Sequence, residues 1–416
     1  MKTRYNYLIL LFLMVFSGVA QSQEILNQYL KIAAENNPGL RARFNQYLAA
    51  LEVAPQVGTL PDPQFAFGYF IQPVETRVGP QNAKISLTQM FPWFGTLGAK
   101  EDVAVHQAKA KYEAFEETKS KLFYDVKASY YNLYFTEKAI QKIRENIDIL
   151  NSFNVLALIK VEAGLASAVD ELRIEMEIAD LENQLALLRD QYFVQLVEFN
   201  NLLDNDENTE VEIPDSLWAE EFPYDKQSLL DSIYTNNHQL LSYDFQFQSF
   251  VSKEQASRKS GLPAFSVGVD YIFIGKSENP ALEAKQSGKD AILFPKIGLT
   301  IPLYRKKYNA MVNEAVYLQK SVTNQKVEKK NVLETLFENT NKNYKDADRR
   351  LDLNKRQSIL ANQAMQILQT EYSTQNKNFE EILRMERRLL KYTLELEKAR
   401  ADKNAAVAFM EYLMGK

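Results

Sequence analysis

The sequence predicts a mainly α-helical chain in which long helical hairpins are combined with four β-strands. Residues 96–163 contain no proline and almost no glycine, and their apolar residues recur at three-and-four spacing, as in a long packed helix. The segments ahead of them alternate between apolar and polar residues, which is typical of strands. The same order of segments returns about two hundred residues later. A strand that runs directly into a rod-like helix, twice in one chain, is the plan that needs an explanation.

The first segment, Ile25 to Val53, has the spacing of an amphipathic helix. Asn36-Asn37-Pro38-Gly39 interrupts it with a helix stop and restart. A strand is predicted over Gln64 to Gln72, followed by a loop over residues 73–82 and a return strand that ends near Phe91. These segments predict a broken helix and a β-hairpin ahead of the long helix.

Alternation gives each predicted strand one apolar, largely aromatic face and one small or polar face. The first face is predicted to meet lipid and holds Phe65, Phe67, Tyr69, Phe265, Tyr271 and Phe273. The second is predicted to line a pore and holds Lys84, Ser86, Thr88, Asp270, Lys296 and Thr300. Alternation alone also fits a soluble β-sandwich with an aromatic core, and the charged residues would then simply pair across strands. Aromatic residues on one face and small or hydroxyl residues on the other favour a membrane barrel.

The long helix is predicted from Thr96 to about Ala163. At ~1.5 Å per residue it would be roughly 100 Å long, which no compact domain accommodates. Gly164-Leu165-Ala166-Ser167 breaks it, and a return helix reaches about Leu203. The apolar seam of the return helix is predicted to contain Leu172, Met176, Ala179, Ala186 and Phe193.

The chain then repeats itself with an offset of 200 to 212 residues. Asn236-Asn237-His238 corresponds to the helix stop of the first half. A second β-hairpin follows, and a long helix then reaches Tyr372. It reverses over residues 373–377 and returns from Phe379 to Met414. Between the halves, nine acidic residues and no lysine or arginine predict a solvated connector without a binding role. The expected organisation is a signal peptide (1–20), a first repeat (21–203), the acidic connector (204–225) and a second repeat (226–416).

The N-terminus reads as a secretory signal. Lys2 and Arg4 precede an apolar run, Leu8 to Phe16, that is too short to span a bilayer, and Gly18-Val19-Ala20 suits cleavage. An N-terminal membrane anchor is the alternative, but no stop-transfer flank follows. Removing residues 1–20 lowers the formal net charge from −5 to −7, which disfavours nucleic-acid binding. No later segment approaches the ~20 apolar residues of a transmembrane helix.

Composition also argues against most site chemistry. The absence of cysteine excludes disulfides, thiolate metal sites, cysteine nucleophiles and a lipid anchor on an N-terminal cysteine. The only histidines, His106 and His238, lie in unrelated contexts, and the methionines are scattered. No glycine-rich phosphate loop is present. We therefore expect no catalytic residue, no cofactor and no metal site, and we do not expect an enzyme.

Four strands cannot close a membrane barrel alone. Known barrels have at least ~8 strands, and an open edge in lipid leaves backbone groups unpaired. If the strands cross a membrane, the barrel must be shared between chains, and three chains would supply twelve strands. The fold class expected is therefore mainly α with membrane β, in which long helical hairpins are combined with four strands per chain that contribute to a barrel shared between chains.

Four motifs carry a family resemblance over essentially the whole mature chain. They are Asn37-Pro38 with Leu40, Pro61-Asp62-Pro63, Phe91-Pro92-Trp93-Phe94-Gly95, and the helix-tip turn VEAGLASAVDEL at residues 161–172. In this duplicated order the sequence resembles the TolC family of outer-membrane efflux proteins. Residues 90–95 are further similar to its heavy-metal-efflux branch.

The resemblance implies a homotrimer with a β-barrel in the outer membrane and an α-helical tunnel in the periplasm. It implies a passive exit duct of a tripartite efflux system, fed by an inner-membrane pump through a periplasmic adaptor that docks at the helix tips. Carried over by position, the docking residues are Gly164, Leu165, Ser167, Asp170, Thr374, Glu380 and Ile382. The second tip departs from the family pattern, because Thr374 replaces a glycine and Phe379 precedes the acidic position.

Acidic residues gather near both reversals of the chain. In a trimer Asp170, Glu171, Glu371 and Glu381, together with Glu380, would form rings that select cations or gate the tunnel. The alternative is that they complement helix dipoles at helix starts. Both interpretations stay open from the sequence.

A different class of function is the alternative to the duct: a soluble periplasmic coiled-coil adaptor or a structural rod. An adaptor would usually have one helical hairpin flanked by many short strands, whereas this chain has two hairpins and two strand pairs. Metal ions, drugs and secreted small molecules are all compatible with the sequence as cargo.

The two strand-to-helix crossings are equivalent in role and unlike in chemistry. Pro92 and Gly95 let the first crossing change from sheet to helix, and Trp93 and Phe94 are expected near the membrane interface. The second crossing, Ile297 to Tyr304, keeps a proline but continues into the basic run Arg305, Lys306 and Lys307.

Overall fold

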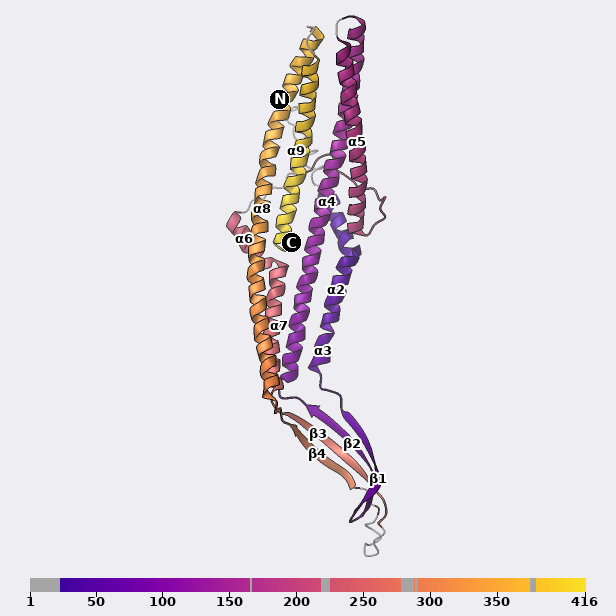
Figure 1. Ribbon diagram of the computed structural model, residues 1–416, viewed down its shortest axis with the longest axis vertical. Coiled ribbons are helices and arrows are strands. Elements are labelled where there is room, and N and C mark those ends of the chain that lie inside the picture. Colours follow the sequence, from indigo (N-terminus) through magenta and orange to yellow (C-terminus); the bar gives the residue numbers. More distant parts are fainter. Residues whose placement is uncertain (1–22, 165–166, 218–224, 278–287, 289–290, 375–378) are drawn as a thin grey trace, which may run out of the picture. The chain divides into compact units, whose positions relative to one another are not determined.

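The computed structural model describes residues 23–164, 167–217, 225–277, 288, 291–374 and 379–416. The predicted signal peptide, Leu165 and part of the acidic connector lie outside these ranges. Figure 1 shows the elements in order: a helix over residues 23–36, α2 (Pro38–Leu51), α3 (Val53–Gly58), β1 (Gln64–Thr76), β2 (Gly79–Phe91), α4 (Thr96–Glu162), α5 (Ala168–Leu203), α6 (Lys226–Asn236), α7 (His238–Ser260), β3 (Ala264–Ile274), β4 (Ala291–Thr300), α8 (Arg305–Thr374) and α9 (Glu380–Leu413). The predicted order of helix, β-hairpin, long helix, reversal and long helix is confirmed in both halves.

These elements belong to two compact units, and each unit takes segments from both halves of the chain. One unit, here called the helical unit, is built from the chain up to Arg43, Phe115–His238 and Lys329–Lys416. The other, here called the strand unit, is built from Phe44–Ala114 and Gln239–Glu328 and contains all four strands. Within the described ranges, no helix combines the length and the hydropathy needed to cross a bilayer.

The strand unit contains one antiparallel sheet in the order β1-β2-β3-β4 (Figure 1). Its register aligns the predicted faces across all strands. Phe67 lies opposite Ile85, which lies opposite Tyr271, and Phe265 lies opposite Leu299. Because paired residues of neighbouring strands share a face, most apolar residues form one face and the small and polar residues the other, with Ile272 and Phe294 among the apolar exceptions on the polar face. The predicted alternation is confirmed.

The first β-hairpin is longer than the sequence predicts. We expected a strand to Gln72 and a loop over residues 73–82, but β1 continues to Thr76 and β2 starts at Gly79. That expectation was wrong because the pairing with β2 shifts register between Tyr69 and Val74, which accommodates Pro73 without a ladder bond from its nitrogen.

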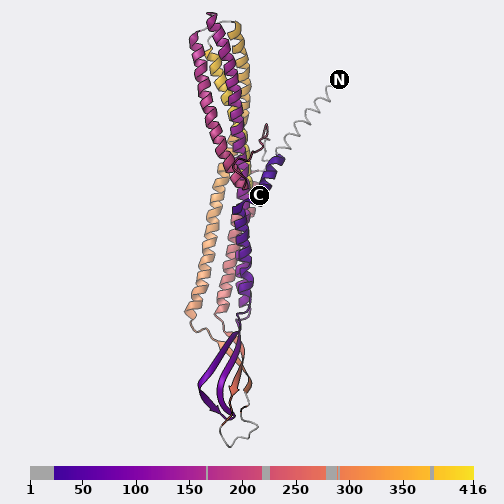
Figure 2. The ribbon, with the colours of Figure 1, turned by 90° about the vertical axis from the view of Figure 1, so that its right-hand side faces the viewer.

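The core of the helical unit lies among α4, α5, α8 and α9, which run along one another (Figures 1 and 2). The three-and-four spacing of α4 predicts a seam of Leu133, Ile140, Ile143, Ile147, Leu150, Leu158 and Val161. Its first five residues are buried, whereas Leu158 is 43% exposed. Buried tyrosines satisfy their hydroxyl groups across helices. Tyr134 donates to Glu397 Oε2 at 2.6 Å, and Tyr412 donates to Glu117 Oε1 at 2.6 Å. These bonds join α4 to α9 where a buried hydroxyl would otherwise be costly.

The helix α5 buries a different face from the one predicted. We expected its seam at Leu172, Met176, Ala179, Ala186 and Phe193, but all five are exposed in this chain. The buried residues are Ile174, Leu181 and Leu185, and Phe199, Asn200 and Leu203 towards the end of the helix. The prediction was wrong because α5 carries two apolar faces, and only one of them packs within its own chain.

The acidic connector is also more ordered than predicted. Val211 and Leu217 are buried in the core of the helical unit. Asn200 Nδ2 donates to the carbonyl oxygen of Thr209 at 2.9 Å, and Tyr130 donates to the carbonyl oxygen of Glu212 at 3.1 Å. The part described up to Leu217 is therefore attached to the helices and is not simply solvated.

Two hydrogen bonds lie at equivalent positions of the two predicted repeats. Asn37 Nδ2 donates to the carbonyl oxygen of Leu202, and Asn237 Nδ2 donates to that of Leu413, both at 3.0 Å. Each asparagine closes the C-terminal end of the return helix of its own half, where carbonyl groups lack helical partners. The motif Asn37-Pro38 and its echo at Asn237-His238 are thus structural clamps.

Candidate functional site

The first helix tip joins α4 to α5 within the helical unit. Gly164 has φ +71°, the left-handed conformation that ends many helices, and a Cβ there would meet nothing within 4 Å. Its conformation, rather than crowding, therefore favours glycine. Ser167 is the N-cap of α5, and its hydroxyl accepts from the Val169 amide at 3.3 Å. Leu165 lies outside the described residues.

Ion pairs connect the first hairpin to the second one near their tips. Arg173 of α5 lies 3.5 Å from both Asp170 of its own helix and Glu380 of α9. Further along, Arg387 Nε of α9 donates to Glu177 of α5 at 2.6 Å. Arginine residues therefore link α5 to α9 at two levels.

The predicted acidic residues do not form one cluster in this chain. Asp170 and Glu380 share Arg173, whereas Glu381 pairs with Arg384 on its own helix. Glu171 and Glu371 are half-buried. Asp170 and Glu171 lie in the first turn of α5, and Glu380 and Glu381 in that of α9, so the dipole interpretation has a geometric basis.

The second helix tip is held by an aromatic cluster. The Phe379 side chain is fully buried, and its ring centroid lies 5.5 Å from that of Phe153 and 5.2 Å from that of Tyr372. Lys160 Nζ donates to the carbonyl oxygen of Tyr372 at 2.5 Å and lies 3.7 Å from the Tyr372 ring centroid, within cation–π range. Ile382 is buried beside them. Thr374 is the last residue of α8, and its side chain is not described.

The sequence did not single out the residues that join the two tips: Lys160, Arg173 and Arg387. Their partners lie more than 200 residues away along the chain. The one available signal was Phe379, an aromatic residue at a helix start where a polar cap is usual. Around the first tip, apolar side chains instead point to solvent: Val155, Ile159, Val169, Leu172 and Met176.

A buried polar pair lies one turn further along α9. Asn146 Nδ2 of α4 donates to Glu386 Oε1 at 2.7 Å, and both residues are buried. Burial raises the pKa of Glu386 above its ordinary value, and the hydrogen bond from Asn146 opposes this rise. Lys142 and Glu145 line the adjoining groove. The pair joins the first long helix to the last one through a carboxyl group in a largely apolar contact.

On the polar face of the sheet, the three predicted charged residues come together. The Asp270 carboxylate lies 2.6 Å from Lys84 Nζ and 2.9 Å from Lys296 Nζ. Only 5% of the Asp270 side chain is exposed, against 38% and 34% for the two lysines. A Cβ on Gly268 would lie 2.7 Å from Lys296 Cε, so glycine at this position gives the lysine room to reach the carboxylate. Ser86, Thr88 and Thr300 share this face by register.

The opposite face of the sheet is apolar and open to its surroundings. Phe65, Phe67 and Tyr69 on β1 are each more than 60% exposed. Phe265 and Phe273 on β3 are about one third exposed, and Tyr271 is half-buried. A soluble sandwich would cover such a face with a second sheet, whereas here the one sheet of the described chain leaves it uncovered.

The two crossings differ as the sequence suggests. At the first, residues 92–95 separate β2 from α4, and the Trp93 ring stacks on Phe265 at 5.8 Å. Phe94 beside it is 80% exposed. At the second, β4 ends at Thr300 and α8 begins at Arg305, with Leu303 and Tyr304 exposed between them.

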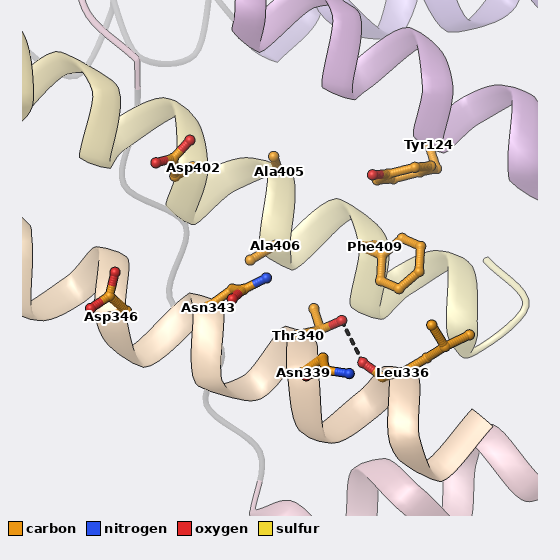
Figure 3. Close-up of a pocket in the computed structure, with 10 residues that line it drawn as sticks. All are labelled: Tyr124, Leu336, Asn339, Thr340, Asn343, Asp346, Asp402, Ala405, Ala406 and Phe409. Carbon is orange, nitrogen blue, oxygen red and sulfur yellow. Dashed lines mark hydrogen bonds between the residues drawn. The ribbon is translucent and has the colours of Figure 1, made fainter. Parts of the chain in front are cut away.

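A groove of about 410 Å³ lies among α4, α8 and α9 in the helical unit (Figure 3). Tyr124 and Phe409 line one part of it, and Asp346 and Asp402 another. Arg350 holds both carboxylates, at 3.0 and 2.7 Å. These lining residues contain no paired nucleophile and base. Among the described residues, no group of three or more histidine, cysteine, aspartate or glutamate side chains could hold a metal ion.

Comparison with known proteins finds one matching family model and a set of solved structures that share one fold. The model of the outer membrane efflux protein family matches residues 29–204. No curated protein sequence matches the chain. Solved structures with the same fold include a membrane protein from Pseudomonas aeruginosa (15% identity, TM-score 0.75, covering 94% of this chain and 92% of that one), the outer membrane protein VceC from Vibrio cholerae (12%, 0.74, 94% and 96%) and the open state of the outer membrane channel MtrE from Neisseria gonorrhoeae (14%, 0.72, 94% and 89%).

Proposed function

We propose that the chain belongs to the outer membrane efflux protein family, whose model matches residues 29–204, and that three copies of it form the exit duct of a tripartite efflux system. In this proposal the twelve strands of the trimer close a barrel in the outer membrane, and the helices continue it as a tunnel into the periplasm. The duct is passive: a pump in the inner membrane and a periplasmic adaptor deliver the cargo. The chain reaches the outer membrane after removal of its signal peptide.

The observation that carries this proposal is a sheet with two free edges and an uncovered apolar face. Among the residues that the structure describes, the sheet order is β1-β2-β3-β4, in which β1 and β4 each pair with one strand only. Free edges in lipid leave backbone groups without partners, so the strands must pair with other copies of the chain. The aromatic face then meets lipid and the Lys84–Asp270–Lys296 face lines the pore.

The second apolar face of α5 supports the same assembly. Leu172, Met176, Leu187 and Phe193 of α5 are each at least 50% exposed, although a monomeric soluble protein rarely exposes such a stripe. On α8, Ile359, Leu360 and Ile367 are exposed to a similar extent. In a trimer the neighbouring chain would cover these residues, and the tunnel wall would be continuous.

The direct test is extraction and reconstitution. Protein extracted from outer membranes is expected to migrate as a heat-modifiable trimer and to form pores in planar lipid bilayers. Single-channel recording measures the pores. A protein that stays monomeric in the soluble periplasmic fraction and never conducts would support the alternative, a soluble coiled-coil adaptor or rod, and would overturn the duct.

The ion pairs between α5 and α9 suggest how the tunnel is kept closed, and they give a second prediction. Replacing Arg173 and Arg387 by glutamine (R173Q/R387Q) removes both links between the hairpins. Each partly exposed pair contributes on the order of 0.2–1 kcal/mol, so we expect the open probability to rise about two- to thirtyfold for the two together. Single-channel recording of the purified trimer measures it.

The matched control is Arg384→Gln. Arg384 lies on α9 like Arg387, and its replacement removes one positive charge, as Arg387→Gln alone does, but its partner Glu381 is on α9 itself, so no link between hairpins is removed. Its open probability should stay near that of the wild type. An equal rise in the control and in R173Q/R387Q would mean that charge alone, rather than the links, controls opening.

A further inference from the structure

The start of α8 contradicts a local rule of helix electrostatics. Arg305, Lys306 and Lys307 open the helix in succession, although the helix dipole disfavours positive charge at this end. Residues 291–313 contain no aspartate or glutamate to offset them. At the first crossing, by contrast, Lys100 is followed directly by Glu101 and Asp102. Three positive charges at a helix end where the dipole disfavours them suggest that these residues have a function other than stabilising the helix.

The basic side chains at this crossing are available to a ligand. Arg305, Lys306 and Lys307 are all exposed. Arg305 Nη1 donates to the carbonyl oxygen of Gly261 at 2.8 Å, which fixes its position, and Lys307 Nζ lies 5.7 Å from the Tyr308 ring centroid. Neither contact neutralises the charge. The run therefore presents three cations on one short segment.

Apolar side chains lie directly beside this basic run. Leu303 is 76% exposed and Tyr304 is 84% exposed. They follow the end of β4 in the chain, where Leu299 pairs with Phe265 on the apolar face of the sheet and Phe265 lies 6.3 Å from Phe94. An apolar band thus ends where the cations begin. This order, from apolar to aromatic to basic, matches the passage from acyl chains through the interface to charged headgroups.

We propose that Arg305, Lys306 and Lys307 bind the headgroups of anionic phospholipids in the inner leaflet of the outer membrane. The proposal rests on the proposed function, because it places this end of the strands at the periplasmic side of the barrel. Leu303 and Tyr304 lie at the glycerol and acyl boundary, and the long lysine side chains extend along it to the phosphates. Negative headgroups also reverse the unfavourable field at the start of α8.

The experiment is lipid competition on the intact trimer. The purified protein is equilibrated with equal amounts of phosphatidylglycerol and phosphatidylcholine with identical acyl chains, and native mass spectrometry counts the lipids retained. Each basic residue near an anionic headgroup contributes about a fivefold preference. We expect the wild type, with three basic residues, to retain phosphatidylglycerol about a hundredfold over phosphatidylcholine, and the K306Q/K307Q variant, which keeps Arg305, to show about a fivefold preference.

Two variants distinguish an effect of this basic run on lipid preference from an effect of the protein's total charge. K342Q/K345Q removes the same charge from exposed positions further along α8 and should keep the wild-type preference. K306R/K307R keeps the positive charge and should also keep the wild-type preference for phosphatidylglycerol. Equal retention of the two lipids by the wild type, or an unchanged preference in K306Q/K307Q, overturns the proposal.

A competition with inorganic phosphate identifies the source of the anion. Millimolar phosphate should leave the preference for phosphatidylglycerol in place, because the acyl chains and the apolar band contribute to lipid binding. If phosphate abolishes the preference, the site is a pocket for soluble anions and the lipid proposal fails. A trimer that conducts but shows no lipid preference leaves the duct standing and overturns only this inference, whereas a protein without pores overturns both.

Discussion

Phe379→Ala is expected to loosen the second helix tip by about 3–5 kcal/mol, the usual cost of removing a fully buried aromatic side chain. The cavity would lie between Phe153 and Tyr372, whose rings pack on Phe379. Hydrogen–deuterium exchange of the first turns of α9 measures this loss, because local opening free energy sets the protection. We expect protection to fall by about two to four orders of magnitude.

The same substitution is expected to make the closed pore conduct more often, because the second helix tip is held less firmly. With Phe379 removed, α9 loses its buried start, and the open probability of reconstituted pores should rise together with the exchange rate. Phe379→Leu, which keeps most of the volume, should give a smaller effect in both measurements. Unchanged protection in Phe379→Ala would mean that the aromatic cluster does not hold the tip.

Asn146→Ala is expected to weaken the contact between α4 and α9 in a way that depends on pH. Without Asn146, the buried Glu386 loses its hydrogen-bond donor, which costs about 1–3 kcal/mol and more when the carboxyl is charged. Burial already raises the pKa of Glu386, and removing the opposing hydrogen bond raises that pKa further.

The sign of the pH dependence follows from the direction of this pKa shift. A carboxyl whose folded pKa lies above its unfolded value contributes its stabilisation fully below the unfolded pKa of about 4.5. The contribution is lost as pH rises through the folded pKa. The contact should therefore be weaker at pH 7 than at pH 5 in the wild type, and the difference should be larger in Asn146→Ala.

Hydrogen–deuterium exchange over residues 382–390, corrected for intrinsic rates at the two pH values, measures the effect. Glu386→Gln provides the neutral reference and should remove the pH dependence in both backgrounds. Glu395→Gln is the control, because Glu395 lies on the same helix with 45% of its side chain exposed. If Asn146→Ala lowers protection equally at both pH values, the ionisation of Glu386 is not involved.

The fold could be predicted because its signals are local and repeated. Alternation identified the strands and their faces, and the register then aligned those faces across the sheet. The glycine and serine of the first tip were recognisable because Gly164 and Ser167 satisfy backbone requirements of the helix ends. Such requirements depend on neighbours in sequence, so a single sequence displays them.

The contacts that join distant segments could not be predicted in the same way. Periodicity marks an apolar face but does not say whether the same chain or another copy covers it, and for this reason the wrong face of α5 was chosen. The Asn146–Glu386 pair did leave a signal, because Glu386 lies four residues after Ile382 on the buried side of α9. A charged residue in an apolar seam usually sets register or partner choice. The ion pairs of Arg173 and Arg387 left no such signal in the sequence.

The two asparagine clamps have a consequence for symmetry. Each clamp ties the end of a return helix to the first helix of its own half, so each half is closed on itself. If three chains assemble as proposed, they form a ring of six similar hairpin units of two alternating kinds, with six-fold pseudosymmetry and three-fold true symmetry. Any ring of identical adaptor molecules that docks on it must either leave every second unit empty or bind two unlike surfaces.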